Sequence, residues 1–459
     1  MTPTLSWRQR LVLVVVLTTT SALAAWLTTP RRGTPRAAVG PGGTGEIVLA
    51  LAGDAAVSVP LDLDGPSLQA IGSLVRRASL GLVNFELAPS PLTPAVSDAP
   101  ARWPAATPAA AADLRHLGFG AVSLANNHTF DAGADGLALV QAQLDAAGVA
   151  HAGGGANLDA ARRATYVATP GGTVALVSIA ISHAAGARAT ARRGDINGRP
   201  GVNGVRFARR LAVDDAAFVT LRAAFPPAAL RRNPDGVTWD LLGITVVRGE
   251  RAGMALVADP SDLDTLVTAV REARGQAAAV VVSLHAHEPG NGVDDVPDLL
   301  RGLAHAAIDA GADVVHGHGP HRLRGVELYR ERPIFYSLGN FVFPDRALRP
   351  EAADEFEDHG RNVLSPFGGD APRQLDFSDD VWWQSAIAVV RLDRGRIGRI
   401  ELHPLDVGVG QDGTTRGLPA LASPALGTAI LERVRALSAP LGTSIAIESG
   451  VGVVSGTTP

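Results

Sequence analysis

The sequence predicts an α/β fold built from layers of strands and helices. From residue 46 onward, apolar runs typical of buried strands alternate with Ala/Leu-rich stretches of helical periodicity. Several of these runs end in carboxylate, amide or imidazole side chains, which open α/β folds gather at one edge of the sheet. Strands are expected at 47–52, 81–85, 121–125, 173–180, 244–248, 279–284, 313–316, 334–338 and 385–392. Helices are expected at 66–79, 108–117, 135–147, 211–224, 261–274, 296–310 and 425–439.

Composition narrows the class of protein. The 459 residues allow two or three domains, and 46% hydrophobic with 19% charged residues is typical of globular chains. A net charge of -4 gives no general attraction to nucleic acid. The absence of cysteine excludes disulfides, thiolate zinc sites and cysteine nucleophiles.

The first 28 residues read as a targeting or anchoring segment. Arg8 and Arg10 precede the uncharged apolar stretch 11–27, and Arg31 and Arg32 follow it. The stretch is either a signal peptide, with Ala22-Leu-Ala24 as the cleavage site, or a short single-pass membrane anchor. Either alternative predicts an extracytoplasmic protein, secreted or membrane-anchored.

The rest of the chain divides into a linker, a main domain and a tail. Residues 29–45 are rich in Pro and Gly and predict a flexible linker. The main domain is expected over 46–408, with insertions at 184–240 and 344–380 where strand–helix alternation breaks down. Residues 409–459 are expected to form a C-terminal helix and tail that pack on this domain.

The strongest chemical signal is a set of strand ends. The apolar run 121–125 leads directly into Asn126-Asn127-His128, and Asp131 follows three residues after His128. Other apolar runs end in Gly53-Asp54, in Asn84-Phe-Glu86, in His285-Ala-His287-Glu288 and in His316-Gly-His318-Gly-Pro-His321. Imidazole with carboxylate and amide oxygen is the ligand mixture of borderline divalent metals such as Zn, Mn and Fe. One buried histidine is ordinary. Four histidines at strand ends or in Gly-framed turns predict metal ligands, namely His128, His285, His318 and His321.

These motifs, together with Tyr336-Ser-Leu-Gly-Asn340-Phe, occur in an order that resembles the bacterial CapA family of capsule and poly-γ-glutamate biosynthesis proteins. That family is similar to the calcineurin-like metallophosphoesterases, and the resemblance spans roughly residues 46 to 408. It implies a layered metallophosphoesterase-like β-sandwich flanked by helices. Two departures stand out: Ala55 and Ala56 follow Asp54 where an Asp-x-His is usual, and the last histidine pair is one residue wider than Gly-His-x-His.

Carried over residue by residue, the resemblance implies a centre that holds divalent metal ions, two in number. Asp54 and His321 would bind one ion, Glu86 would bridge, and Asn127, His285 and His318 would bind the other. His128 would donate a proton to the leaving group. Asp131 either orients His128 or caps the helix expected near residue 135, and the sequence leaves both alternatives open.

Four neighbouring residues are candidates for substrate contact or for support of the ligands. His287 is interpreted as a residue at the rim of the site, and Glu288 as a supporting carboxylate or an exposed one. Asn84 shares a strand face with Glu86 and either binds metal or substrate or holds a turn. Asn340 either bonds to the metal-binding turn or simply forms a turn, and the second interpretation is preferred.

Two functions compete at this point. One is a metal-dependent hydrolase using metal-bound hydroxide to cut a phosphoester or a γ-glutamyl amide. The other is a non-catalytic membrane-tethered component of a polymer synthesis or export complex, with the corresponding synthase or export proteins as partners. Seven arginines between residues 188 and 210 either contact an anionic polymer, such as poly-γ-glutamate or a phosphorylated glycan, or form a solvated loop. Phe207 is the one aromatic residue of this stretch, too few for a stacking platform, so nucleic acid is not expected.

Overall fold

The computed structural model describes residues 45–89, 105–184, 186–249, 253–344, 379–410 and 416–456. The predicted linker, the apolar stretch 11–27 and nearly all of the predicted insertion 344–380 lie outside these ranges. Among the described helices, none combines the length and the apolarity that a membrane-crossing segment requires.

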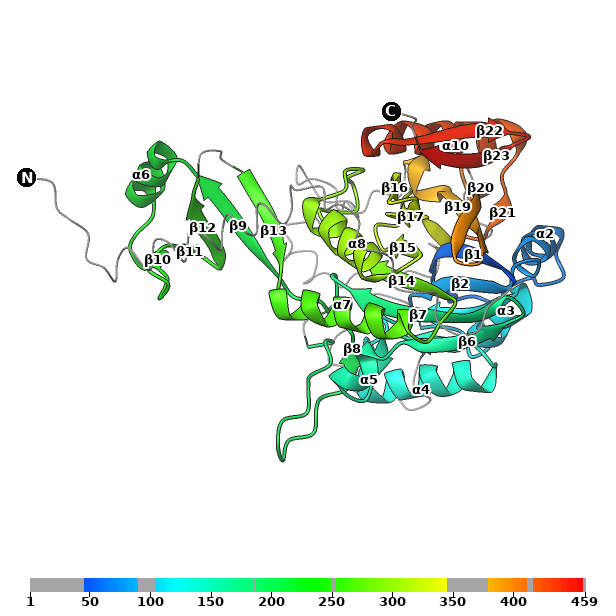
Figure 1. Cartoon of the computed structure of the whole chain (residues 1–459), viewed down its shortest axis with the longest axis horizontal. Coiled ribbons are helices and arrows are strands. Elements are labelled where there is room, and N and C mark those ends of the chain that lie inside the picture. The colour runs from blue at the N-terminus through cyan, green and yellow to red at the C-terminus, as the bar shows by residue number, and fades with distance from the viewer. Residues whose placement is uncertain are drawn as a thin grey trace, which may run out of the picture. The chain divides into compact units, whose positions relative to one another are not determined.

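Two large sheets form the body of the fold (Figure 1). The large sheet has ten strands. Eight of them lie in the order β22 (Thr443–Glu448), β23 (Val451–Gly456), β20 (Arg396–Asp406), β19 (Gln384–Asp393), β1 (Glu46–Ala55), β2 (Leu80–Phe85), β3 (Phe119–Ser123) and β4 (Ala150–Ala152). The other two pair beside this path, β18 (Asn340–Val342) with β1 and β21 (Ala420–Leu421) with β20. The second sheet has six: β16 (Val326–Tyr329), β17 (Arg332–Phe335), β15 (Val314–His318), β14 (Ala279–His285), β7 (Gly172–Ala180) and β6 (Thr165–Thr169).

Alternating apolar side chains hold the two sheets together. Leu49 and Leu51 of β1 point into the same cluster as Leu176 of β7 and Val281 of β14, so this cluster fills the space between the sheets. The other face of the large sheet carries α2 (Pro66–Val75), α3 (Ala110–Leu117) and α4 (Gly133–Ala146). The other face of the second sheet carries α7 (Pro260–Arg274) and α8 (Asp298–Ala310). The result is a four-layered α/β fold, in agreement with the predicted class.

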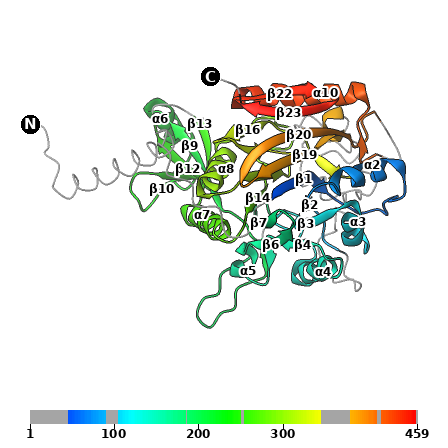
Figure 2. The same cartoon turned by 45° about the vertical axis from the view of Figure 1, so that its right-hand side comes forward.

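The C-terminal helix α10 (Pro424–Ser438) closes one end of this core (Figure 2). Ser423 caps its N-terminus, Pro424 occupies its first turn, and Ile430, Leu431 and Val434 enter the cluster between the sheets. A short 3-10 turn, Ala439–Leu441, leads from it to β22. Another, Asp380–Trp383, precedes β19.

A separate small sheet lies within residues 207–258. Its strands run in the order β10 (Leu230–Arg232), β11 (Trp239–Leu241), β12 (Ile244–Arg248), β9 (Phe207–Val213) and β13 (Gly253–Ala258), with α6 (Asp215–Ala224) packed on one face. The helix expected at 211–224 therefore begins only at Asp215, because residues 207–213 form β9. The strand expected at 244–248 belongs to this small sheet and not to the main layers.

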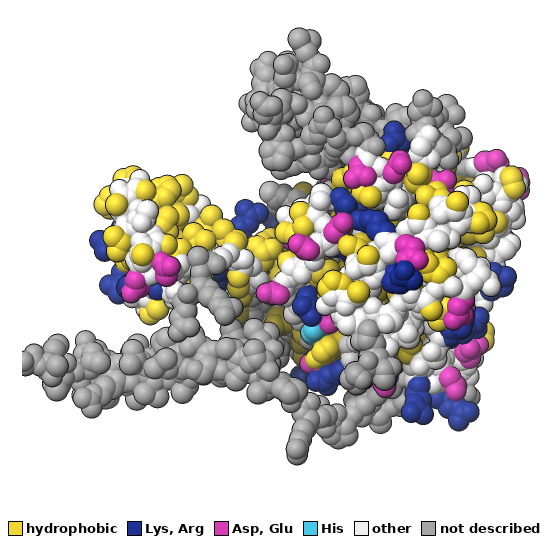
Figure 3. Space-filling model, turned by 90° about the horizontal axis from the view of Figure 1, so that it is seen from above, with side chains coloured by type: hydrophobic (Ala, Val, Ile, Leu, Met, Phe, Trp, Pro, Cys, Tyr) yellow, Lys and Arg dark blue, Asp and Glu magenta, His cyan; other side chains and the backbone are white. Residues whose placement is uncertain are grey.

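Hydrophobic side chains gather on the surface of the small sheet and α6 (Figure 3). Val219, Val237, Leu242 and Met254 are all more than half exposed there. Elsewhere the same view shows arginines and carboxylates intermixed. The strand expected at 334–338 also differs: β17 ends at Phe335, Leu338 forms only an isolated bridge with Leu323, and the next strand is β18.

A buried carboxylate fastens the segment before the small sheet to α7. Asp262, in the first turn of α7, accepts bonds from Arg162 of α5 (Leu158–Arg162) at 2.8 Å, from Arg188 at 2.9 Å and from the Arg206 Nε at 2.9 Å. Its side chain is only 2% exposed. Two of the seven arginines proposed to contact a polymer thus pair with a carboxylate of the protein itself, and the Arg206 side chain stays 51% exposed. Burial alone would raise the pKa of Asp262, but the bonds from Arg206 and the charges of Arg188 and Arg206 lower it.

Replacing Asp262 by Asn is expected to lower the free energy of unfolding by about 3 kcal/mol at pH 7, because it leaves three guanidinium groups around a neutral side chain. A carboxyl whose folded pKa is lowered stabilises above its unfolded pKa of about 3.9 and loses this effect as pH falls through the folded value. The difference between wild type and Asp262→Asn, measured by urea unfolding, should therefore shrink below pH 4.

Asp240→Asn is the matched control, since Asp240 pairs with the largely exposed Arg231 at 3.2 Å. It should cost less than about 1 kcal/mol. Equal losses in the two variants would contradict the structural role of Asp262.

Candidate metal centre

The candidate centre lies between the two sheets, at the carboxyl ends of β1, β2, β14 and β15. Asp54 is the next-to-last residue of β1, Glu86 follows β2, and His285 and His318 end β14 and β15. The register of β14 with β15 places His285 directly across from His318. Strand order and register thus bring together side chains that are far apart in the sequence.

Backbone packing fixes the position of Asp54. The Asp54 amide donates to the Gly339 carbonyl at 3.0 Å, in the turn between β17 and β18. A Cβ on Gly53 would lie only 1.8 Å from that carbonyl oxygen, so glycine is required before Asp54. The Gly319 amide in turn donates to Asp54 Oδ2 at 3.0 Å. The carboxylate is therefore held from two strands and a turn.

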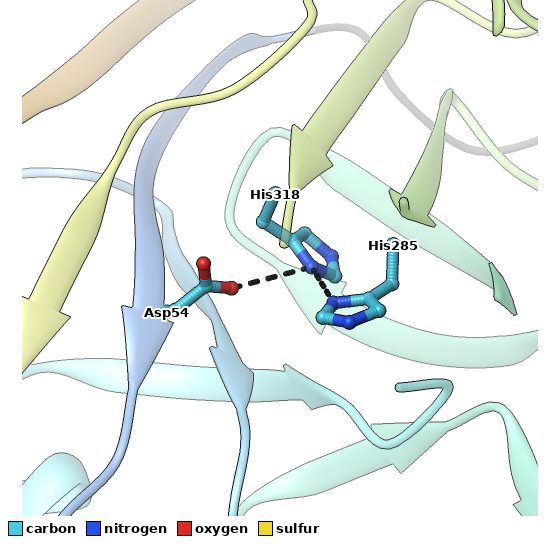
Figure 4. A group of neighbouring side chains, drawn as sticks. All are labelled: Asp54, His285 and His318. Carbon is cyan, nitrogen blue, oxygen red and sulfur yellow. Dashed lines mark hydrogen bonds and ion pairs between the residues drawn. The ribbon is translucent and has the colours of Figure 1, made fainter. Parts of the chain in front are cut away.

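Two groups of possible metal-binding atoms form at this place. Asp54, His285 and His318 offer one ligand atom each, all within 4.8 Å of one another (Figure 4). Glu86, His287 and His321 form a second group by the same measure. The groups adjoin, since His285 Nε2 lies 3.1 Å from His287 Nε2 and 3.7 Å from Glu86 Oε1.

Amide side chains complete the polar interior. Asn127 Oδ1 lies 2.9 Å from His285 Nε2. Asn84 donates to Asp54 Oδ1 at 2.8 Å and to Glu86 Oε2 at 3.3 Å, so it lies inside the centre rather than in a turn. Asn126 supports Asn84 and the turn that follows β3: its amide donates to Asn84 Oδ1 at 3.0 Å, while its oxygen accepts from the backbone amides of His128 and Thr129.

The pKa shifts of the buried carboxyl groups and imidazoles indicate a site for a cation. Burial raises the pKa of Asp54 to about 6, and burial followed by the charge of Asp54 raises the pKa of Glu86 well above its usual range. Burial, followed by the neighbouring imidazoles, lowers the pKa of His285 and His318 well below 6.5. Two carboxyl groups that share a buried site with neutral imidazoles are stabilised as anions by a cation between them. The donor set therefore fits a divalent metal ion.

The outer nitrogens of two imidazoles have hydrogen-bond partners that orient the rings. Asn340 gives both amide hydrogens to the backbone carbonyls of His321 and Trp382, each at 3.2 Å, so its oxygen accepts from His321 Nδ1 at 2.9 Å. His321 itself has a φ of 58°, a left-handed conformation that is strained for a non-glycine residue. Asn291 Oδ1 lies 2.6 Å from His287 Nδ1. In both rings Nε2 is left to face the centre.

His287 and Glu288 lie closer to the centre than the sequence indicated. The ring of His287 contacts the ligand group itself rather than the rim, and its backbone amide donates to Ser182 Oγ at 2.7 Å. Ser182 donates in turn to Glu288 Oε2 at 2.7 Å.

His128 and Asp131 form a pair at the mouth of the centre. Asp131 Oδ2 lies 2.7 Å from His128 Nδ1. Asp131 does not cap α4, whose N-cap is Ala132. Both residues line a cavity of about 710 Å³ that Asn127, Ser182, His183, Arg206, His287 and Glu288 also border. Its volume lies in the range of pockets that bind small molecules.

Sequence reasoning missed the residues that hold the ligands in place. Asn126, Ser182 and Asn291 stand in turns, where Asn and Ser are common for local reasons. The one available signal was the position of Asn291 four residues after His287. Pairing between strands, which decides the remaining contacts, cannot be read from one sequence.

Comparisons with known proteins identify the family of the chain. The family model "Bacterial capsule synthesis protein PGA_cap" matches residues 45–345. The chain is 35% identical to uncharacterized protein y4sH of Sinorhizobium fredii over 358 residues, which are 74% of this chain and 77% of the relative. It is 43% identical to the PGA biosynthesis protein CapA of Bacillus subtilis over 115 residues, 24% of this chain and 29% of the relative. With the capsule biosynthesis protein CapA of Bacillus anthracis it shares 28% identity over 236 residues, 50% of this chain and 41% of the relative.

The arrangement of strand-end ligands and the match over residues 45–345 lead to one conclusion: the chain belongs to the PGA_cap family of bacterial capsule synthesis proteins.

Proposed function

We propose that this capsule-family protein is a metal-dependent hydrolase acting on a phosphoester or on a γ-glutamyl amide of a capsule polymer. The observation that carries the proposal is the convergence of two buried carboxylates and four inward-facing imidazoles on one place, with a His–Asp pair at its mouth. Buried carboxyl groups with raised pKa values beside neutral imidazoles are typical of functional sites.

Each group has a defined task in this proposal. Divalent ions held by Asp54, Glu86, His285, His287, His318 and His321 would supply Lewis-acid activation of water and of the scissile group. The number and identity of the ions are part of the proposal, with two ions of Mn, Zn or Fe as the first to test. Asn127 and Asn84 orient the ligands and the substrate oxygen.

His128 is the proposed general acid. Its Nδ1 is bonded to Asp131, which leaves Nε2 to carry a proton toward a leaving group in the adjoining cavity. Asp131 is then a positioning residue that holds the ring and stabilises its charged form.

The direct test loads the full-length chain with Mn²⁺, Zn²⁺ or Fe²⁺ and follows hydrolysis of p-nitrophenyl phosphate, bis-p-nitrophenyl phosphate and poly-γ-glutamate. Turnover that depends on the metal supports the proposal. Stoichiometric metal without turnover of any substrate would instead favour a non-catalytic component of a polymer synthesis or export complex.

Replacing His128 by Gln is expected to lower kcat about 10²- to 10⁴-fold for an ester with an alkyl leaving group. The loss should be much smaller for p-nitrophenyl phosphate, because p-nitrophenolate leaves without a proton. Asp131→Asn should show the same dependence on the leaving group with a smaller loss. Metal content should stay at the wild-type level in both variants. An equal loss with both leaving groups would contradict the role of His128 as the acid.

We also propose an anionic capsule polymer as the ligand and an extracytoplasmic location. The location rests on the apolar stretch 11–27 between arginines, and fractionation of cells that express the tagged chain tests it. The polymer proposal rests on the cavity and on Arg206 at its border. Co-sedimentation of the metal-loaded chain with poly-γ-glutamate at low and high salt tests the second point.

A further inference from the structure

Behind the metal centre, a chain of buried hydrogen bonds runs from the large sheet to His318. His316 Nε2 lies 2.7 Å from the backbone carbonyl oxygen of Ala52 in β1. Ser283 Oγ lies 3.2 Å from His316 Nδ1 and 2.7 Å from His318 Nε2. All three side chains are fully buried, with 0% exposure each.

Strand register builds this chain. Ser283 of β14 is directly across from His316 of β15, and His285 is across from His318. Since side chains two residues apart share a face of a strand, all four point toward the large sheet. Ala52, the acceptor at the far end, lies two residues before Asp54 on β1. This series of hydrogen bonds therefore connects β1, which carries Asp54, to β15, which carries His318, across the space between the sheets.

The direction of each hydrogen bond follows from the chemistry of its end. A backbone carbonyl can only accept, so the hydrogen between Ala52 and His316 sits on Nε2. A buried imidazole favours its neutral form, which leaves His316 Nδ1 as an acceptor. Ser283 then donates its single hydroxyl hydrogen to His316 Nδ1. The Ser283 oxygen can then only accept a hydrogen bond from His318. His318 Nε2 must therefore carry the hydrogen of that bond.

We propose that Ser283 and His316 are positioning residues that fix His318 in the Nε2–H tautomer, so that its Nδ1 lone pair faces the metal centre. His318 Nδ1 lies 3.0 Å from His285 Nδ1 and 3.5 Å from Asp54 Oδ1, inside the first group of ligand atoms. The opposite tautomer would point a hydrogen at the place of the cation. This inference rests on the proposed metal centre, and it assigns a role to two residues that are not ligands themselves.

The proposal predicts that Ser283→Ala weakens binding of Mn²⁺ or Zn²⁺ about 10- to 100-fold, the usual cost of losing a group that orients a ligand. His316→Leu should weaken binding as well. The measurement is isothermal titration of the metal-free full-length chain with each metal salt alone.

Ser178→Ala is the matched control. Ser178 lies on β7, directly across from Ser283 on its other side, and is 2% exposed. Among the described residues, its hydroxyl has no hydrogen-bond partner. The control removes the same atoms from the same sheet and should change the dissociation constant less than about threefold. Equal metal affinity in Ser283→Ala and Ser178→Ala would overturn the proposal.

A second measurement needs no variant. Long-range ¹H–¹⁵N NMR spectra of the metal-free wild type, with ¹⁵N in the histidine rings, report the tautomer of His318 directly. The expected form is Nε2–H, and it should become a mixture in Ser283→Ala. An Nδ1–H form in the wild type would overturn the proposal even if metal binds. A wild-type chain that takes up no metal, with His318 still in the Nε2–H form, would contradict the metal centre and not the tautomer assignment.

Discussion

Asp54→Asn and Glu86→Gln are each expected to weaken metal binding more than 100-fold, beyond the 10- to 100-fold typical of groups that only orient a ligand. Each change removes a buried negative charge from the centre. Only one carboxylate then remains beside the four neutral imidazoles, so at most half of the charge of a dication is balanced. Activity should fall with metal content, which is measured by elemental analysis of the dialysed chain.

Asp54→Asn should also make the metal-free protein more stable. Burial raises the pKa of Asp54 to about 6, so the ionised carboxylate costs the metal-free fold on the order of 2 kcal/mol at neutral pH. A raised folded pKa gives stability below the unfolded pKa that is lost as pH rises through about 6. The advantage of Asp54→Asn over metal-free wild type should therefore grow from pH 5 to pH 8. Asp54→Asn also removes the charge that helps to raise the pKa of Glu86, and this effect adds to the same trend.

Glu327→Gln is the control for both measurements. Glu327 is also buried, but it bonds to His305 at 2.9 Å and to Tyr336 at 2.5 Å, outside the candidate centre. This variant should keep wild-type metal affinity and lose stability. If Asp54→Asn kept its metal as Glu327→Gln does, the centre would lie elsewhere.

The metal-facing side chains were open to prediction from the sequence because strand ends carry them. A buried apolar run that stops at Asp54, at His285 or at His318 signals both the strand and the edge where it ends. Parallel pairing then places these ends together, and the structure shows such pairing between β14 and β15 and between β1 and β2. The layered α/β class followed from the same runs.

The small sheet could not be predicted in the same way. Its strand β9, Phe207-Ala-Arg-Arg-Leu-Ala-Val213, has no clean alternation and many residues that favour helices, so part of it was assigned to a helix. Only pairing with β12 and β13, which are distant in sequence, makes it a strand. His287 was misjudged for a related reason: β14 ends at His285, and the chain turns the next ring back into the centre.

A buried ion pair at the opposite end of β14 and β15 has the largest expected effect on stability. Arg274, the last residue of α7, donates from Nη1 to Asp313 Oδ2 at 2.6 Å, and both side chains are 1% exposed. Asp313 Oδ2 also accepts from the Val280 amide at 2.9 Å, and Arg332 Nη1 lies 3.3 Å from Asp313 Oδ1. The pair thus joins α7 to the beginnings of two strands that end in metal ligands.

Asp313→Asn is expected to lower the free energy of unfolding by about 3–5 kcal/mol, because it leaves the guanidinium of Arg274 buried without an opposing charge. The corresponding fall in Tm is about 5 °C for a chain of this length. Metal affinity at 25 °C should not change, since Val280 and His285 stand five residues apart on β14, roughly 17 Å along the strand. Thermal unfolding and metal titration of the same sample measure the two effects separately.

The double variant Arg274→Met with Asp313→Asn tests whether the stability comes from the Arg274–Asp313 pair or from the other contacts of Asp313. Methionine fills most of the volume of the arginine side chain, and the amide oxygen introduced by Asp313→Asn can still accept from the Val280 amide, so neither substitution leaves a buried charge on the α7 side. The double variant should therefore recover most of the stability lost in Asp313→Asn, with a coupling energy of at least about 2 kcal/mol. A double variant that is as unstable as the sum of the two single ones would mean that Asp313 acts through Val280 and Arg332, and that Arg274 contributes only its packing.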